Sequence, residues 1–115
     1  MTMADREARM LDAIYRVYGL QALWTPAAAG PVTTPVVRYQ TQDDVAGLGQ
    51  SEILMRSEVL FWRAADEQRP TDPGQGDLVE VTRPSGALSS YRVLSDPRLE
   101  PEGLEWRCVV QLLTV

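Results

Sequence analysis

The residues of this sequence that could do acid–base, nucleophilic or metal chemistry are its carboxylates and a single thiol. The 115 residues include sixteen Asp and Glu, one cysteine and no histidine. Without histidine there is no Ser-His-Asp or Cys-His catalytic arrangement and no imidazole metal ligand, and one cysteine is too few for a zinc finger. Cys108 lies in the apolar run 106–110, so we interpret it as a small buried hydrophobic residue and not as a nucleophile.

Four pairs of carboxylates are close enough in sequence to be weighed as acid–base pairs or as a cation site. They are Asp43 with Asp44, Asp66 with Glu67, Asp72 with Asp77, and Glu100 with Glu102. Each lies in a segment rich in Gly, Pro or Gln, and none has the alternating ligand spacing of a calcium loop. The glycine turn at 74–77 lacks the Lys-Ser/Thr ending of a phosphate loop. We therefore predict a protein that is not an enzyme and that holds no metal ion or cofactor.

The net charge of −5 separates this chain from proteins that grip nucleic acid through a basic surface. No apolar run approaches the roughly 18 residues that span a membrane. The first sixteen residues mix acidic with apolar side chains, unlike a secretory signal. We expect no membrane partner and no specific binding of DNA.

The segment 2–18 has the pattern of an amphipathic helix, with Gly19 placed to follow its last turn. Leu11, Ile14, Tyr15 and Tyr18 form one apolar stripe at positions i, i+3, i+4 and i+7. We expect this stripe to pack on the protein's own core. The alternative is that the stripe docks on a partner protein.

The rest of the chain reads as short strands separated by turns. We expect strands at 20–25, 36–40, 53–64, 77–83, 90–94 and 104–113, with a bend or bulge near Arg56-Ser57 in the third and a loop at 95–103. This spacing predicts a mostly-β fold, a small antiparallel β-barrel or sandwich with an N-terminal α-helix. We expect a single domain, residues 1–115, with the helix at about 2–18 and the β domain at about 20–115. Its core would be built on Trp24, Phe61, Trp62, Tyr91 and Trp106.

Thr41–Glu52 reads as a long mobile loop between two strands. It is polar and acidic, contains two glycines, and is long for a connection in so small a domain. Its apolar residues Val45 and Leu48 suit a segment that becomes ordered on binding, although an ordinary disordered hairpin tip has the same composition.

An ordered series of features runs through the C-terminal two-thirds of the chain. The strand Glu58–Arg63 leads to a polar turn with Asp66, Gly76-Asp77 opens the strand 78–81, and Tyr91-Arg92-Val93 precedes a loop with Gly103 and a closing strand at Trp106. This series resembles the head–tail joining, or head-completion, proteins of long-tailed phages of the lambda type. Upstream, the helix and the glycine-containing loop occupy the positions of that family's N-terminal helix and long mobile loop.

The resemblance implies a virion structural protein of the neck, made in the host cytoplasm, that completes the packaged head and joins it to the tail. It implies a ring, typically of six subunits, between the portal or adaptor protein and the tail tube or tail terminator protein, through which DNA passes without specific binding. The rival interpretations are a tail-completion or terminator protein, and a soluble β-barrel module that binds a ligand or peptide.

We predict the interface residues from exposure on the expected loop and on the polar side of the helix. They are Arg6, Arg9, Asp43, Asp44, Val45 and Leu48.

Overall fold

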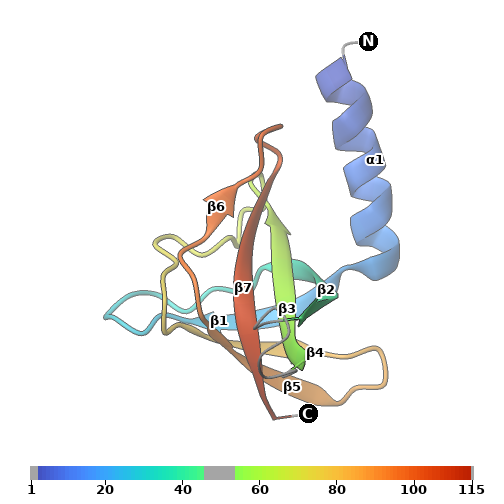
Figure 1. Ribbon diagram of the computed structural model, residues 1–115. Helices are drawn as coiled ribbons and strands as arrows, with labels where there is room; N and C mark the ends of the chain where they lie inside the picture. Colours follow the sequence, from blue (N-terminus) through green and yellow to red (C-terminus); the bar gives the residue numbers. More distant parts are fainter. Residues whose placement is uncertain (1–2, 46–53, 115) are drawn as a thin grey trace.

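The computed structural model describes the backbone of residues 3–45 and 54–114 and the side chains of residues 5–40 and 58–113. Within these residues one helix precedes seven strands (Figure 1). The elements are α1 (Met3–Tyr18), β1 (Leu20–Thr25), β2 (Val36–Val45), β3 (Leu54–Arg63), β4 (Leu78–Thr82), β5 (Leu88–Val93), β6 (Arg98–Leu99) and β7 (Glu105–Thr114). The described part of the chain contains no helix long and apolar enough to cross a membrane.

Six of the strands close into an antiparallel barrel. Their order is β3-β2-β1-β4-β5-β7, and the pairing of β3 with β7 completes the ring. The short strand β6, which the sequence patterns did not predict, lies in the expected loop 95–103 and pairs with the start of β7. The structure thus confirms the mostly-β fold and selects the barrel over the sandwich. Closure leaves the six barrel strands with paired edges over most of their length.

The barrel interior is filled by side chains that alternate inward along the strands. Trp24 and Trp62 meet edge to face with ring centroids 4.9 Å apart, and Tyr91 and Cys108 are buried with them. Such an aromatic pair contributes about 0.5–1.5 kcal/mol beyond the area that it buries. Of the five aromatic residues expected in the core, Trp106 is partly buried against this cluster and the other four are buried.

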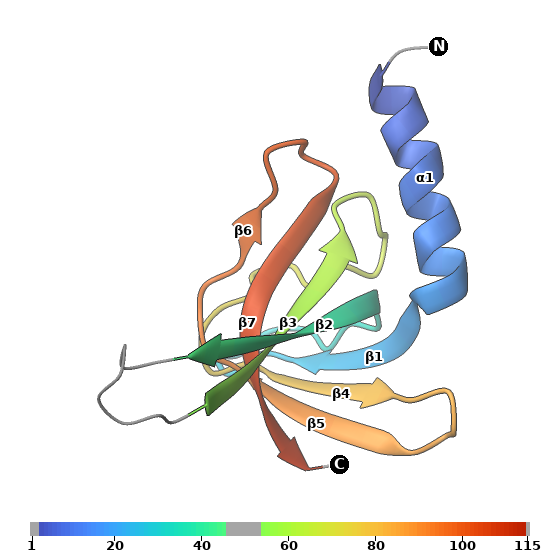
Figure 2. The ribbon, with the colours of Figure 1, turned by 45° about the vertical axis from the view of Figure 1, so that its right-hand side comes forward.

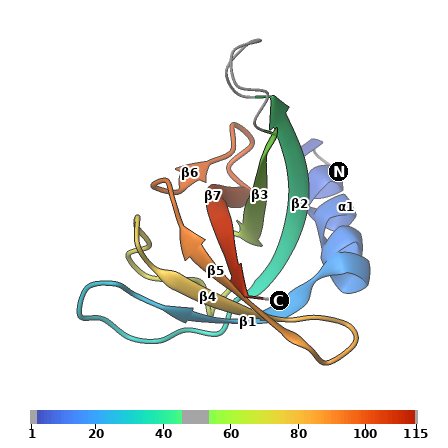
Figure 3. The same ribbon diagram turned by 60° about the horizontal axis from the view of Figure 1, so that its bottom comes forward.

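The hairpin of β2 and β3 is longer and more regular than the sequence indicated. β2 continues to Val45, five residues past its expected end, so the segment 41–45 is strand and not loop. Its pairing with β3 runs without a register shift through Asp43 opposite Arg56, so the expected bulge near Arg56-Ser57 is wrong. Polar residues extend β2 because an equally long partner supplies the hydrogen-bonding ladder, which outweighs their low strand propensity. Figure 3 shows this hairpin extending past the rest of the barrel.

Gly19 joins α1 to β1 at a position where a side chain does not fit. Its amide donates a 2.8 Å hydrogen bond to the carbonyl oxygen of Tyr15. A Cβ atom here would lie 2.3 Å from that oxygen and 2.7 Å from Cγ1 of Val36. The expected glycine after the helix is confirmed, and its physical reason is close approach of the helix end to β2.

Candidate functional site

Tyr15 attaches α1 to the outside of the barrel. It is the one buried side chain among the described residues of the helix, with 4% of its surface exposed. Its hydroxyl donates a 2.6 Å hydrogen bond to Oε2 of Glu105, at the start of β7. Figure 2 shows α1 standing beside the barrel, so that the hydrogen bond spans two separate layers of the fold.

Glu105 is a carboxylate on the outward-facing side of β7. The alternate positions Cys108 and Val110 point into the barrel, and Glu105 is buried because α1 lies over it. Arg38, on β2, binds both of its oxygens, with Nε to Oε2 and Nη2 to Oε1 at 2.8 Å each. The guanidinium also lies over the ring of Phe61, 4.0 Å from its centroid. Glu105 therefore receives three hydrogen bonds from two other elements, in the bidentate geometry that makes Arg–carboxylate pairs strong.

The electrostatics of this cluster keep the Tyr15 hydroxyl and the Arg38 guanidinium in their ordinary protonation states near neutral pH. Burial first, and then the hydrogen bond to the Glu105 carboxylate, raise the pKa of the Tyr15 hydroxyl well above its usual range. The hydrogen bond to Glu105 raises the pKa of Arg38, although burial opposes it. The phenol stays protonated and the guanidinium stays charged, so the helix anchor persists across the physiological range.

A second polar contact lies closer to solvent. Nη1 of Arg63 donates a 2.8 Å hydrogen bond to Oδ1 of Asp12 on α1, and its guanidinium lies over the ring of Tyr15 at 4.8 Å. Because Asp12 is exposed, the ion pair contributes at most about 1 kcal/mol. The ion pair constrains how α1 is rotated on the sheet and adds little to the free energy of helix attachment.

Most of the apolar stripe of α1 is not covered. Of its residues Tyr18 is 67% exposed, and Val17 and Met10, which are not part of the predicted stripe, are 71% and 60% exposed. Ile14 is also exposed, and Leu11 is half-buried. The expectation that the stripe packs on the core is wrong for three of its four residues, because only Tyr15 is buried, and it lies on the outer face of the sheet against Glu105 and Arg63. An exposed apolar face of this kind marks an interaction surface.

A groove runs between α1 and the turn before β7. Its volume is about 370 Å³. Its walls are the apolar residues Met10, Leu11, Ile14 and Leu104 and the acidic residues Glu7, Glu100, Glu102 and Glu105. An apolar floor with one sign of charge around it is typical of a surface that recognises a partner of opposite charge.

A second apolar surface lies on the barrel itself, which we call the barrel surface: Leu23 of β1, Leu78 of β4 and Leu113 of β7. All three are exposed and line one shallow depression over β1, β4, β5 and β7. The depression has a volume of about 390 Å³. The described residues therefore include one exposed apolar surface on the helix and a separate one on the barrel.

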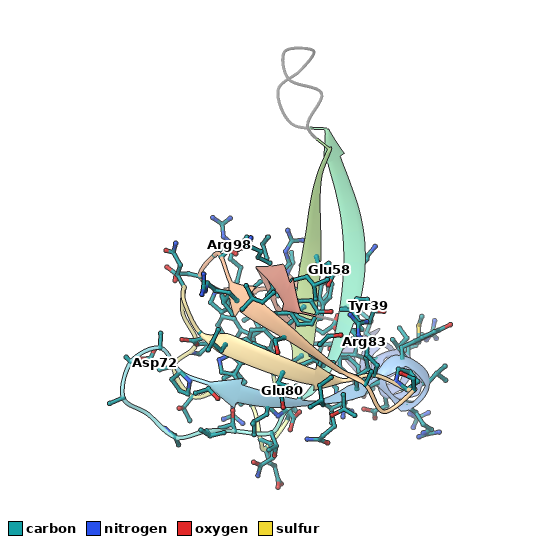
Figure 4. The ribbon with its side chains drawn as sticks, turned by 90° about the horizontal axis from the view of Figure 1, so that it is seen from below. Tyr39, Glu58, Asp72, Glu80, Arg83 and Arg98 are labelled. Atoms are coloured by element: carbon teal, nitrogen blue, oxygen red, sulfur yellow. The ribbon has the colours of Figure 1, made fainter. Side chains whose placement is uncertain are left out.

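Arg83 organises a polar cluster at one end of the barrel (Figure 4). It donates from Nε to Oγ of Ser89 at 2.8 Å and from Nη2 to the hydroxyl of Tyr91, and it stacks over the Tyr39 ring at 4.2 Å. Burial, followed by a hydrogen bond with Glu58, raises the pKa of Tyr91 above its usual range. Arg83, Ser89 and Tyr91 are thus paired with one another, whereas Oε2 of Glu58 is buried without a hydrogen-bond partner among the described residues.

Of the four carboxylate pairs weighed as catalytic candidates, Asp43 with Asp44 has no described side chains, and members of the other three form structural contacts or face solvent. Asp77 is buried and accepts hydrogen bonds at 2.9 Å from Nε1 of Trp24 and from the amides of Ala27 and Gly74. Asp66 accepts from the amide of Val36 at 2.9 Å and from its own turn. Among the described residues no three His, Cys, Asp or Glu side chains gather as a metal site would require.

The predicted interface residues fall in different parts of the structure. Arg6 and Arg9 are exposed on α1, and Arg9 interacts with another group of the protein. Asp43, Asp44 and Val45 belong to β2 near the end of the hairpin, and nothing of their side chains is described. Leu48 lies outside the described residues. The structure therefore places the two helix residues and the three strand residues on separate elements.

Sequence reasoning missed the seat of the helix, although one signal for it was present. Val59, Leu60, Phe61 and Trp62 are four consecutive large apolar residues, and all four are buried. A strand with only one face in the core would alternate, so a continuous run indicates cover on both faces. Here the interior covers Leu60 and Trp62, and the outer-face residue Phe61 lies beneath Arg38 of the helix seat.

Comparison with protein families matches residues 3–110 to the family described as Phage Head-Tail Attachment protein. No curated protein matches the chain significantly. The family match spans α1, the barrel and the groove between them.

Proposed function

The chain belongs to the phage head–tail attachment protein family, and from this premise we propose that it forms a ring in the virion neck, where it completes the packaged head and joins it to the tail. Membership of this family gives the coarser role: a structural protein of the virion that attaches heads to tails. The ring, its proposed six subunits and its place between the portal or adaptor protein and the tail tube or terminator are the finer proposal. The same role requires no catalysis, and we propose that the protein waits in the host cytoplasm before it assembles.

The observation that supports a ring is the pair of separate apolar surfaces. Closed head-to-tail rings require two different patches on each subunit, each meeting the other patch of a neighbour. Val17 and Tyr18, which we call the helix surface, are exposed on α1, whereas Leu23, Leu78 and Leu113 form the barrel surface. We propose that the helix surface of one subunit packs on the barrel surface of the next.

The interface residues predicted from the sequence have a place in this proposal. Arg6 and Arg9 lie on the same helix as the helix surface, about two to three turns closer to its N-terminus, and we propose that they extend the contact with the neighbouring subunit. Asp43, Asp44 and Val45 lie near the end of β2, in the hairpin with β3 that extends past the barrel, and Leu48 follows them in the sequence outside the described residues. We propose that this end of the hairpin contacts the component above or below the ring.

The acidic character of the chain supports passage of DNA through the ring. A net charge of −5 gives no counterion-release drive for binding phosphates. A ring around a DNA channel works best when its wall does not grip the duplex, so we propose that DNA passes without specific binding.

The assembly proposal is tested by native mass measurement and sedimentation, with the purified chain alone and mixed with purified portal-side and tail-side proteins. We expect a hexamer at least in the presence of the component that templates it. The variant Val17→Asp/Tyr18→Asp should fail to form it, because a charge in an apolar interface loses its hydration. Val32→Asp is the matched control, since Val32 is also an exposed apolar residue and lies outside both surfaces.

Three outcomes of this experiment are decisive. A wild-type chain that stays monomeric and binds neither component contradicts the proposed function. A hexamer that tolerates Val17→Asp/Tyr18→Asp as well as it tolerates Val32→Asp contradicts the helix surface as its interface. Binding to tail ends without binding to heads identifies a tail terminator instead.

A further inference from the structure

We propose that the groove between α1 and the turn before β7 binds a short segment of a partner protein in the neck, a segment in which Arg or Lys alternates with apolar side chains. This inference rests on the proposed function and deepens it, because it gives the chemistry of the partner that the ring receives. The groove is distinct from the helix surface and the barrel surface that we assign to contacts between subunits.

The floor of the groove provides the apolar part of the recognition. Of its apolar lining, Met10 and Ile14 on the helix are exposed, and Leu11 on the helix and Leu104 on the turn are half-buried. A volume of about 370 Å³ accommodates a few side chains and not a folded domain. The occupant is therefore a segment that inserts apolar side chains between the helix and the turn.

The rim of the groove provides the charge. Glu105 is neutralised by the bidentate contact with Arg38, and Glu100 has a long 3.8 Å contact with Arg107. Glu7 and Glu102 have no ion pair within the part of the chain that the structure describes. Two carboxylates, one from each wall, are thus left to attract cations.

The two walls together select a basic apolar protein segment over other ligands. A nucleic acid would be repelled, since its phosphates would meet the glutamates. An acidic or neutral apolar segment would leave the rim carboxylates with less favourable surroundings than water. A segment with Arg or Lys on either side of an apolar side chain satisfies both walls at once, with Glu7 on the helix and Glu102 on the turn as its partners.

The groove also couples binding to the position of the helix. Its helical wall is attached to the barrel through Tyr15 and Glu105, and Glu105 itself lines the base of the groove. A segment that contacts both walls adds contacts between α1 and the β6–β7 turn. Binding should therefore hold the helix more firmly against the barrel.

The first test uses the double variant Glu7→Arg/Glu102→Arg in the full chain. Its control is Glu67→Arg/Asp72→Arg, which makes the same change of net charge at two exposed acidic residues outside the groove. Affinity is measured for whichever neck component the wild-type chain binds. We expect the groove variant to bind at least tenfold more weakly and the control to stay within about twofold, with both variants unfolding at the wild-type temperature.

The second test uses a probe that needs no neck component: a synthetic peptide of alternating Arg and Leu, with a Glu-Leu peptide of equal length as its counterpart. In NMR titrations we expect the Arg-Leu peptide to shift the amides of Met10, Ile14 and Leu104, and to lose this effect with Glu7→Arg/Glu102→Arg. The Glu-Leu peptide should leave these amides unchanged.

The outcomes separate this inference from the proposed function. Equal binding of the neck component by wild type and groove variant, or equal shifts from the two peptides, overturns the groove assignment while the ring and the joining role stand. A wild-type chain that binds no neck component contradicts the joining role, and the peptide titration then judges the groove alone. Loss of self-association in the groove variant, with binding of neck components intact, overturns the partner segment and identifies a second copy of the chain as the occupant.

Discussion

Tyr15 is the residue whose removal should release α1 while the barrel stays folded. Its ring is buried between the helix and the outer face of the sheet, and its hydroxyl donates to Glu105. It does not belong to the interior cluster built around Trp24 and Trp62. Replacement by Ala therefore removes the helix anchor and leaves the packing inside the barrel unchanged.

The size of the effect follows from three contributions. Burial of the aromatic ring is worth about 1.5–3 kcal/mol. The hydrogen bond to an ionised carboxylate adds about 1.5–3 kcal/mol, and the contact with the Arg63 guanidinium about 0.5–1 kcal/mol. Because Glu105 keeps its two bonds from Arg38 and regains water, we expect a net loss of about 3–5 kcal/mol of helix attachment. A detached helix of 16 residues is marginal in water, so it should unfold.

Hydrogen exchange resolves this prediction residue by residue. In Tyr15→Ala the amides of α1 should lose protection by roughly 10²- to 10⁴-fold, and those of β4 and β5 should change by less than about twofold. Tyr15→Phe keeps the ring and loses the hydroxyl, so the protection of its helix amides should fall by roughly 10- to 10²-fold. Tyr18→Ala, at an exposed tyrosine of the same helix, should leave protection unchanged. A protected helix in Tyr15→Ala, or a barrel that unfolds with it, would refute the reasoning.

Three further predictions concern the barrel, its junction with the helix and its thiol. Asp77→Ala leaves the buried Trp24 indole N–H without its acceptor and should lower stability by about 3–5 kcal/mol in chemical denaturation, and an effect below 1 kcal/mol would contradict its role. Gly19→Ala forces a Cβ into the Tyr15 carbonyl and should lower the free energy of unfolding by about 1–3 kcal/mol. An unchanged denaturation midpoint would mean that the junction between α1 and β1 rearranges without cost. Burial raises the pKa of Cys108 to about 12, above its unfolded value near 9.0, so the unfolded chain loses this proton first and stability should fall as pH rises from about 9 to 12. Cys108→Val should reduce that decline, and a thiol reagent should label the native wild-type protein at pH 8 only as it unfolds.

The interior of the barrel was predictable because one physical rule governs it. Along β4 the side chains alternate between water and core, and Val79 and Val81 are buried as the period-two pattern requires. Trp24, Trp62 and Tyr91 fell in the interior because no other site in so small a protein covers so much apolar area, whereas Phe61 is buried on the outer face of the sheet and Trp106 only partly. In the barrel interior the local sequence pattern agrees with the global fold, so the buried residues can be identified from the sequence.

The seat of the helix was not predictable from those rules. An apolar stripe shows that a helix has a face to cover, and it does not show what covers it. Here the contact is made by Tyr15 with Glu105 and Arg38, which are 90 and 23 positions away, and two of the three are charged residues on the solvent side of their strands. The continuation of β2 to Val45 was not predictable for a related reason. Its polar residues are held by backbone pairing with β3, and local strand propensity does not include that pairing.

The way α1 is attached explains why its apolar face is available for assembly. A helix held by its apolar stripe would bury that stripe against its own barrel. A helix of this length without tertiary contacts would unfold in water. In this protein one buried tyrosine, a carboxylate and two arginines hold the helix by its edge, and Gly19 sets its distance from β2. Val17 and Tyr18 consequently remain exposed on a helix whose direction is fixed. A preformed surface loses less conformational entropy on binding than a segment that must first fold. This lower entropy cost favours an assembly in which each subunit binds its neighbours one at a time.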